Sequence, residues 1–333
     1  MTSLNIRPAH HASKYAITLI ACMTLSSAWA EIAQNDKAIE DAKYPCDTSG
    51  NANALLARGR ALGVHVYDKN QLACAADLMT QAAQHSAPDL KLLTEALAAI
   101  DEYIEQVSAE RDVDPVGVQT AEWDARLDHA KGQVDALVKI AETKFPGDPG
   151  VAALRIKADL LLHRADDPKD WVAVARRSIT ELNKLVDAAP NVLNGAPLVI
   201  LGKLYLDLPP LFGGSPSKAV DLLERARSVD PNDSRRLGYL ALAYAQVDRD
   251  ADAKAVLTQL LAIEPQPATR QYVADSTIVG IGLATRFHDD ALRSSFQAKR
   301  SALFAKSPEL RPHVFVAVDG HGGENPLTGE RQY

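Results

Sequence analysis

The residues of this chain best suited to chemistry are a histidine among glycines and a serine that follows two glycines. His321 stands in the pattern Gly-His-Gly-Gly, which can form an oxyanion loop. A serine hydrolase of that type also needs a Gly-x-Ser-x-Gly turn, and the stretch from Gly213 through Ser215 to Ser217 lacks the final glycine. The remaining histidines lack metal-ligand spacing, and no phosphate-binding glycine loop occurs. The sequence therefore predicts no catalytic residue, no metal site, no cofactor and no enzymatic activity.

The strongest candidate for a binding site is a short apolar loop, Pro209-Pro210-Leu211-Phe212-Gly213-Gly214. Two prolines stiffen the backbone, and two glycines allow backbone angles that other residues avoid. Leu211 and Phe212 would be costly to leave in water. Two interpretations remain open: these side chains form a docking tip or line a ligand channel, or the loop folds back onto neighbouring helices as a long turn.

The loop lies inside a repeating pattern of helices and prolines. Pro190, Pro231 and Pro265 each follow a helical stretch and are 41 and 34 residues apart. The shorter interval is the period of the tetratricopeptide repeat (TPR), a helix–turn–helix unit. Between the last two prolines, the repeat positions for a large apolar residue, a small residue, a tyrosine and another small residue hold Leu237, Ala241, Tyr244 and Ala253. The longer interval contains the apolar loop.

Apolar residues recur at helical spacing, aromatic residues are only 5% of the chain, and proline ends the helices. We therefore predict an all-α fold, a TPR-like right-handed solenoid of antiparallel helix pairs. The expected organisation is a signal peptide at 1–30, degenerate helical repeats at 31–148, TPR-like repeats carrying the loop at 149–265, capping helices at 266–312, and a short strand-like run with a flexible tail at 313–333.

The N-terminus indicates export to the periplasm. Arg7 and Lys14 precede a short apolar run, and Ala28-Trp29-Ala30 matches a cleavage site before the mature chain. An alternative is the lipobox-like Leu19-Ile20-Ala21-Cys22, in which Cys22 would carry a lipid and provide the only contact with a membrane. Removing the two basic residues changes the net charge from −7 to −9. This acidic balance argues against a nucleic-acid partner.

The mature chain keeps two cysteines, Cys46 and Cys74. In an oxidising compartment such a pair predicts a disulfide between an N-terminal segment and an early helix. The alternative is a pair of buried free thiols.

A second candidate surface is the inner face formed by the first helix of each repeat. Placing Tyr205 and Tyr244 at equivalent core positions puts Lys203 and Arg235 on that face, as candidate contacts to a partner or ligand. The other residues expected there are Val199, Leu206, Asp207, Gly238, Leu242 and Gln246. They include no repeated Lys/Arg set that would bind a peptide carboxylate.

The segment from Gly202 to Gly214, followed by Ser217-Lys218-Ala219 and a helix to Val229, resembles the T component of tripartite ATP-independent periplasmic (TRAP) transporters. The resemblance covers about a third of the chain, from Pro149 to Pro265. It implies an exported all-helical protein that associates with a periplasmic substrate-binding protein and assembles with copies of itself around a pore. We expect a non-catalytic scaffold for protein–protein interaction. The alternative is a carrier of a small hydrophobic ligand in an apolar helical channel.

Overall fold

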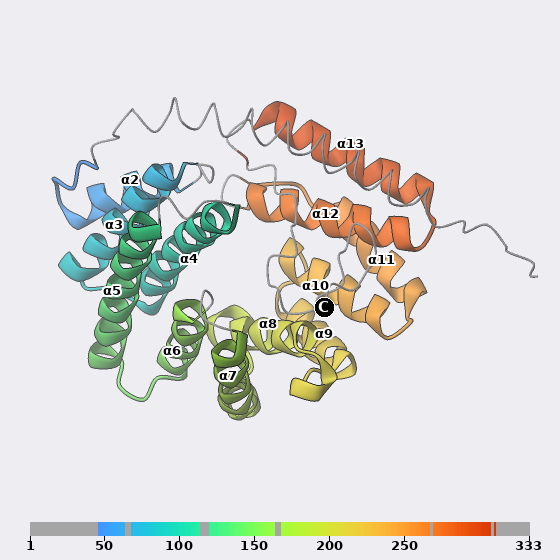
Figure 1. The fold of residues 1–333 in the computed structure, drawn as a ribbon, viewed down its shortest axis with the longest axis horizontal. Coiled ribbons are helices and arrows are strands. Elements are labelled where there is room, and N and C mark those ends of the chain that lie inside the picture. The colour runs from blue at the N-terminus through green and yellow to red at the C-terminus, as the bar shows by residue number, and fades with distance from the viewer. Residues whose placement is uncertain are drawn as a thin grey trace, which may run out of the picture. The chain divides into compact units, whose positions relative to one another are not determined.

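The structure is a computed structural model that describes residues 46–63, 68–113, 120–163, 168–266, 269–307 and 310. Within these ranges every regular element is a helix and no strand occurs (Figure 1). The predicted signal peptide, the alternative lipobox at Cys22, the predicted strand-like run and His321 lie outside the described residues. The helices are α2 (Ala52–Leu62), α3 (Lys69–His85), α4 (Leu90–Val113), α5 (Thr120–Lys144), α6 (Pro149–Leu162), α7 (Pro168–Ala188), α8 (Val192–Asp207), the 3-10 helix η1 (Pro210–Phe212), α9 (Pro216–Val229), α10 (Ser234–Gln246), α11 (Asp250–Leu261), α12 (Arg270–Arg286) and α13 (Asp290–Lys306).

The helices pack as successive pairs. In each of the pairs α2/α3, α4/α5, α6/α7, α8/α9, α10/α11 and α12/α13 the two members contact each other. From the second pair on, the first helix of each pair also contacts the first helix of the next, so that α4, α6, α8, α10 and α12 form a row. The second helix of each pair contacts the first helix of the following pair. The described residues thus form a TPR-like helical solenoid of antiparallel helix pairs, as predicted.

Local sequence signals explain where the helices begin. The side chains of Asp68, Asp148 and Asp233 accept hydrogen bonds from the first free N–H groups of α3, α6 and α10. Proline occupies the first turn of α6 and α9, where its missing N–H has no cost. Helix α3 starts at Lys69, directly after its N-cap Asp68, where the polar run Asp68-Lys69-Asn70 could also be interpreted as a turn.

The apolar core follows the row of helices. One buried cluster includes residues of α3 to α6, and a second includes residues of α6 to α13. Helix α6 serves both, with Leu154 in the first cluster and Ile156 in the second. Tyr205 and Tyr244 are buried in the second cluster, as expected for core positions. A helix that is apolar on two sides fits an interior position in a stack of repeats.

Two further structural findings bear on the sequence analysis. Cys46 and Cys74 are both disulfide-bonded. In the part of the chain that the structure describes, no helix has the length and apolar character needed to cross a membrane.

Small residues let paired helices approach closely. A Cβ atom on Gly280 of α12 would lie 2.5 Å from the Phe296 ring of α13, and one on Gly202 of α8 would lie 2.8 Å from Leu223 of α9. In contrast, a Cβ atom on Gly132 of α5 would have no neighbour within 4 Å outside its own helix turn. These glycines therefore differ in what a methyl group would meet.

We predict opposite effects of alanine at two of these glycines. Gly280→Ala should lower the free energy of unfolding by about 1–3 kcal/mol, because the buried Phe296 ring has no room to move away. Gly132→Ala should raise it by about 0.5–1 kcal/mol, since alanine favours a helix and nothing is displaced. Urea unfolding followed by circular dichroism measures both. Equal effects of the two substitutions would contradict the close packing of α12 on α13.

Candidate functional site

The apolar loop between α8 and α9 is closed at its base by backbone hydrogen bonds. The N–H groups of Phe212 and Gly214 both donate to the Pro209 carbonyl, at 2.9 and 3.1 Å. The Ser215 N–H donates to the Tyr205 carbonyl in the last turn of α8, at 2.8 Å. These bonds leave few unpaired backbone groups for an alternative conformation. The loop is therefore a defined projection between two helices.

The tip of this projection is apolar and exposed to solvent. Leu211 is 85% exposed and Phe212 is 40% exposed, and they are the only large hydrophobic residues exposed among the described residues. The alternative in which the loop folds back and buries both side chains is therefore wrong. Two adjacent exposed apolar side chains on a fixed backbone have the form of a docking tip. Binding at this tip remains a prediction.

The two glycines of the loop have different roles. Gly213 has a φ angle of +106°, which side chains disfavour, but a Cβ atom there would meet nothing within 4 Å. A Cβ atom on Gly214 would lie 1.6 Å from the carbonyl oxygen of Leu208. Gly214 is thus required because another part of the backbone occupies the place of its side chain.

Alanine substitutions should separate these two roles. Gly214→Ala forces the loop to open and should cost about 2–3 kcal/mol of unfolding free energy. Gly213→Ala should cost about 1–2 kcal/mol through backbone strain alone. The exposed Ser217 serves as the control, and Ser217→Ala should change the unfolding free energy by less than about 0.5 kcal/mol. Urea unfolding of the three variants tests the order, and a neutral Gly214→Ala would contradict the loop geometry.

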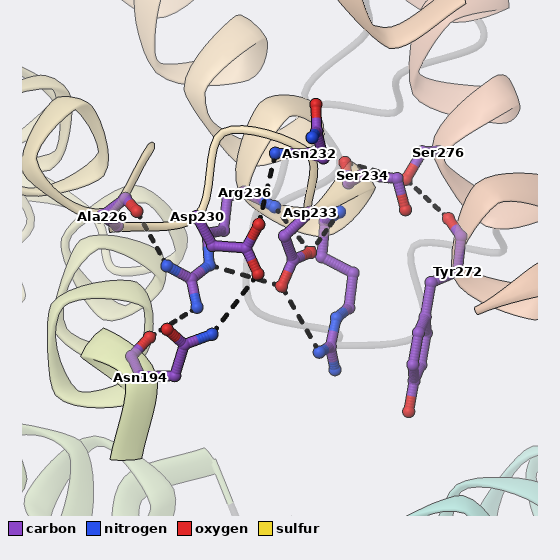
Figure 2. A network of polar contacts seen from close by, with 10 residues as sticks. Asn194, Ala226, Asp230, Asn232, Asp233, Ser234, Arg236, Tyr272 and Ser276 are labelled. Atoms are coloured by element: carbon purple, nitrogen blue, oxygen red, sulfur yellow. Dashed lines mark hydrogen bonds and ion pairs between the residues drawn. The ribbon is translucent and has the colours of Figure 1, made fainter. Parts of the chain in front are cut away.

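A buried arginine joins the loop-bearing repeat to the next one (Figure 2). Arg236 of α10 is 4% exposed and donates to the Ala226 carbonyl at the end of α9 at 2.7 Å. It also donates to the Asn194 carbonyl at the start of α8 at 2.6 Å, and its Nε lies 3.3 Å from Oδ2 of Asp233. Asn194 in turn donates to the Asp230 carboxylate at 3.3 Å. One side chain therefore fixes the starts of α8 and α10 and the end of α9.

The Asn194 carbonyl is available because the start of α8 is not helical. Leu193, Asn194 and Gly195 have φ angles of +46°, +55° and +72°, a run of left-handed residues that is unfavourable for the leucine. Arg236 and Asp230 hold this turn by the hydrogen bonds to Asn194. Sequence analysis missed the turn, although Asn-Gly is a recognised turn signal.

Loss of the buried guanidinium should destabilise the stack. We expect Arg236→Met to lower the unfolding free energy by about 3 kcal/mol, because the buried Ala226 carbonyl and the partly buried Asn194 carbonyl lose their donor. Arg236→Lys should be nearly as harmful, since a single ammonium group lacks the fork that reaches both oxygens. Arg225→Met, at an exposed position of α9, is the matched control. Thermal unfolding of the three variants gives the comparison, and equal midpoints for Arg236→Met and Arg225→Met would contradict this role.

The inner-face candidates Lys203 and Arg235 each contact an aromatic ring of the next repeat. The Lys203 ammonium forms an ion pair with Asp207 and lies 5.8 Å from the centre of the Tyr239 ring. The Arg235 guanidinium lies 3.9 Å from the centre of the Tyr272 ring. Both cations therefore form cation–π interactions that cross the boundary between the first helices of adjacent pairs.

The surroundings of these rings are partly desolvated. Burial raises the pKa of Tyr239 and of Tyr272. Burial acts to lower the pKa of Arg235, but electrostatic interactions with Tyr272 and Asp233 outweigh it and the pKa is raised. Arg235 nevertheless keeps 47% of its side-chain surface exposed. The Arg235 side chain is thus accessible to solvent, although protein surrounds part of it.

Acidic residues of α4 act on the same rings. Glu102, Asp101 and Glu105 contribute to the raised pKa of Tyr272, and Glu105 also contributes to that of Tyr239. These acids of α4 therefore lie near enough to the two tyrosines for their charges to act on them, although the helices are far apart in sequence. Helical spacing shows that these acids share a face of α4, but it does not show which other helices lie near that face. The sequence therefore did not predict their effect on the tyrosines.

No catalytic or metal site was predicted, and the structure gives no reason to add a metal site. Among the described residues, no group of three or more His, Cys, Asp or Glu side chains is arranged to hold a metal ion.

Comparisons with known proteins add little beyond the fold. No protein-family profile and no curated protein sequence matches the chain. The structure is similar to the crystal structure of a thermophilic TPR protein of Thermus thermophilus, with 21% sequence identity and a TM-score of 0.38 over 55% of this chain and 89% of that chain. This level of similarity carries no argument about binding or activity.

Proposed function

We propose that the protein is an exported, non-catalytic scaffold whose loop between α8 and α9 docks a periplasmic protein of the TRAP substrate-binding type. The observation that carries this proposal is the pair of exposed apolar side chains, Leu211 and Phe212, on a loop held by backbone hydrogen bonds. TPR-like solenoids present extended surfaces to other proteins. The resemblance to TRAP T components lies in this same segment, which favours the substrate-binding protein as the partner.

The loop has the physical properties of an anchor. Full burial of a leucine or phenylalanine side chain contributes about 1.5–3 kcal/mol, and interface energy concentrates in a few such residues. Binding loses less conformational entropy when the anchor is already rigid. The bonds around Pro209, Gly214 and Ser215 supply that rigidity.

Export is the second part of the proposal. It is supported by the basic start and apolar run of the N-terminus and by the disulfide-bonded state of Cys46 and Cys74, since disulfides persist in oxidising compartments. A carrier of hydrophobic ligands would need an apolar channel. The charged residues on the inner faces of α4, α8 and α10 count against that alternative.

The tip should be required for partner capture. We predict that Leu211→Asp with Phe212→Asp weakens capture of a periplasmic substrate-binding protein by about 100-fold or more, because two apolar anchors are replaced by charges that lose hydration. The measurement is affinity purification of the tagged protein from periplasm, with mass spectrometry of bound proteins, followed by titration of the captured protein.

The control carries the same two charge changes elsewhere. Ala173 of α7 and Ala251 of α11 are exposed, and the double variant Ala173→Asp/Ala251→Asp should bind as the unmodified protein does. Unchanged capture by the loop variant, with helical content intact, would refute docking at the tip. Capture of a different kind of protein through the tip would refute the TRAP assignment alone. Mass spectrometry of the purified N-terminus distinguishes cleavage after Ala30 from lipidation at Cys22.

A further inference from the structure

The turn at the start of α8 contains an Asn-Gly pair, Asn194-Gly195, and the sequence has no other. In such a pair the glycine nitrogen can attack the side-chain carbonyl carbon of the asparagine, because glycine has no side chain that blocks the approach. A C–N bond forms, the amide nitrogen takes up the proton of the glycine N–H and leaves as ammonia, and a cyclic imide remains. Water then opens the imide to aspartate or isoaspartate. The Asn194 side chain is exposed, so water reaches it.

The folded chain holds both reacting groups in other bonds (Figure 2). The Gly195 N–H donates to the Asn191 carbonyl at 3.2 Å. The Asn194 side-chain amide donates to the Asp230 carboxylate at 3.3 Å, and its main-chain carbonyl accepts from the buried Arg236 at 2.6 Å. The attack requires these bonds to open. Its rate therefore follows the population of molecules in which the start of α8 is transiently open.

Conversion to aspartate would remove a donor from the junction. The Nδ2 group that donates to Asp230 would be replaced by a carboxylate oxygen, which only accepts hydrogen bonds. Two carboxylates at this separation repel each other. Asp230 also accepts the Asn232 N–H at 3.3 Å, in the turn between α9 and α10. Displacement of Asp230 would therefore loosen that turn as well.

Conversion to isoaspartate would change the backbone itself. The main chain would run through the former side chain and become longer by a methylene group, and the former main-chain carbonyl would become a free carboxylate. That carbonyl is the acceptor of Arg236. A Cβ atom on the buried Gly195, the next residue, would already lie 3.4 Å from a methyl group of Val229. The longer chain therefore has little room between α8 and α9.

We propose that Asn194 is a deamidation site, that the junction around Arg236 protects it, and that its conversion loosens the stack of repeats. The co-reactant is water. The site lies where the loop-bearing repeat meets the next one, and it does not depend on docking at the loop tip.

Peptide mapping by mass spectrometry measures the protection, because deamidation replaces an NH2 group by an oxygen. The purified protein is incubated at mildly alkaline pH, either folded or unfolded in guanidinium chloride. We expect Asn194 to be converted about 10-fold or more faster in the unfolded chain, since unfolding removes the bonds that hold it and Gly195.

A variant of the buried arginine tests the source of the protection. Arg236→Lys lacks the fork that holds the Asn194 carbonyl, and it should speed the conversion in the folded protein about 5- to 30-fold. Arg225→Lys, at an exposed position of α9, is the matched control and should leave the rate unchanged. Circular dichroism shows whether each variant is folded.

A second set of variants tests the consequence and does not require Arg236 to be changed. Asn194→Asp should lower the midpoint of thermal unfolding by about 3 °C or more, whereas Gln297→Glu, at an exposed position of α13, should shift it by less than about 1 °C. Adding Asp230→Asn to Asn194→Asp should restore most of the loss. The amide at position 230 then donates to the carboxylate at position 194, so the hydrogen bond is re-formed in the opposite direction.

Three results would overturn the proposal. One is an equal rate of conversion in the folded and the unfolded protein, or no conversion in either. Another is an equal rate in folded Arg236→Lys and Arg225→Lys, which would remove the part of the junction in protection. The third is an equal midpoint for Asn194→Asp and Gln297→Glu, or no recovery with Asp230→Asn, which would show that conversion leaves the stack intact.

Discussion

Arg236 carries a positive charge in a place that solvent hardly reaches, and oxygens from three parts of the chain compensate it. A buried charge of this kind is tolerated only when its donors are satisfied. The Ala226 and Asn194 carbonyls must therefore stay where the guanidinium can reach them. That requirement fixes the start of α8 against the end of α9 and the start of α10, and the positions of both candidate surfaces follow from it.

The position of the loop tip depends on this junction through helix α8. Helix α8 begins in the left-handed turn at Asn194 and ends where the loop begins, so its direction determines where the loop projects. The base of the loop is closed onto α8 by the bond from Ser215 to Tyr205. The loop from Pro209 to Gly214 adds residues between α8 and α9. These residues hydrogen-bond to one another, so the contacts between the two helices stay intact. An insertion at the turn between paired helices thus adds a surface without disturbing the stack.

The helix pairs and the loop were predictable from the sequence, whereas the contacts between distant helices were not. Proline spacing and apolar periodicity locate elements because these signals are local: Pro149 and Pro216 lie in the first turns of their helices. The buried role of Arg236 is different, since its oxygens lie 10 and 42 residues away. Helical register predicts that Arg235 lies on the inner face, but it does not show that Arg236 reaches the carbonyls of Ala226 and Asn194. Their difference arises from the direction that each takes from α10.

That difference in direction explains why two consecutive arginines of α10 have different surroundings. Consecutive residues on a helix point about 100° apart, so Arg236 turns toward the junction while Arg235 turns toward α12 and the inner face. Asp233 caps the helix and bonds Arg236, which leaves only a weak hold on Arg235. Packing against the Tyr272 ring therefore orients Arg235. The same segment thus holds one arginine by hydrogen bonds to carbonyl oxygens and its neighbour by packing on an aromatic ring.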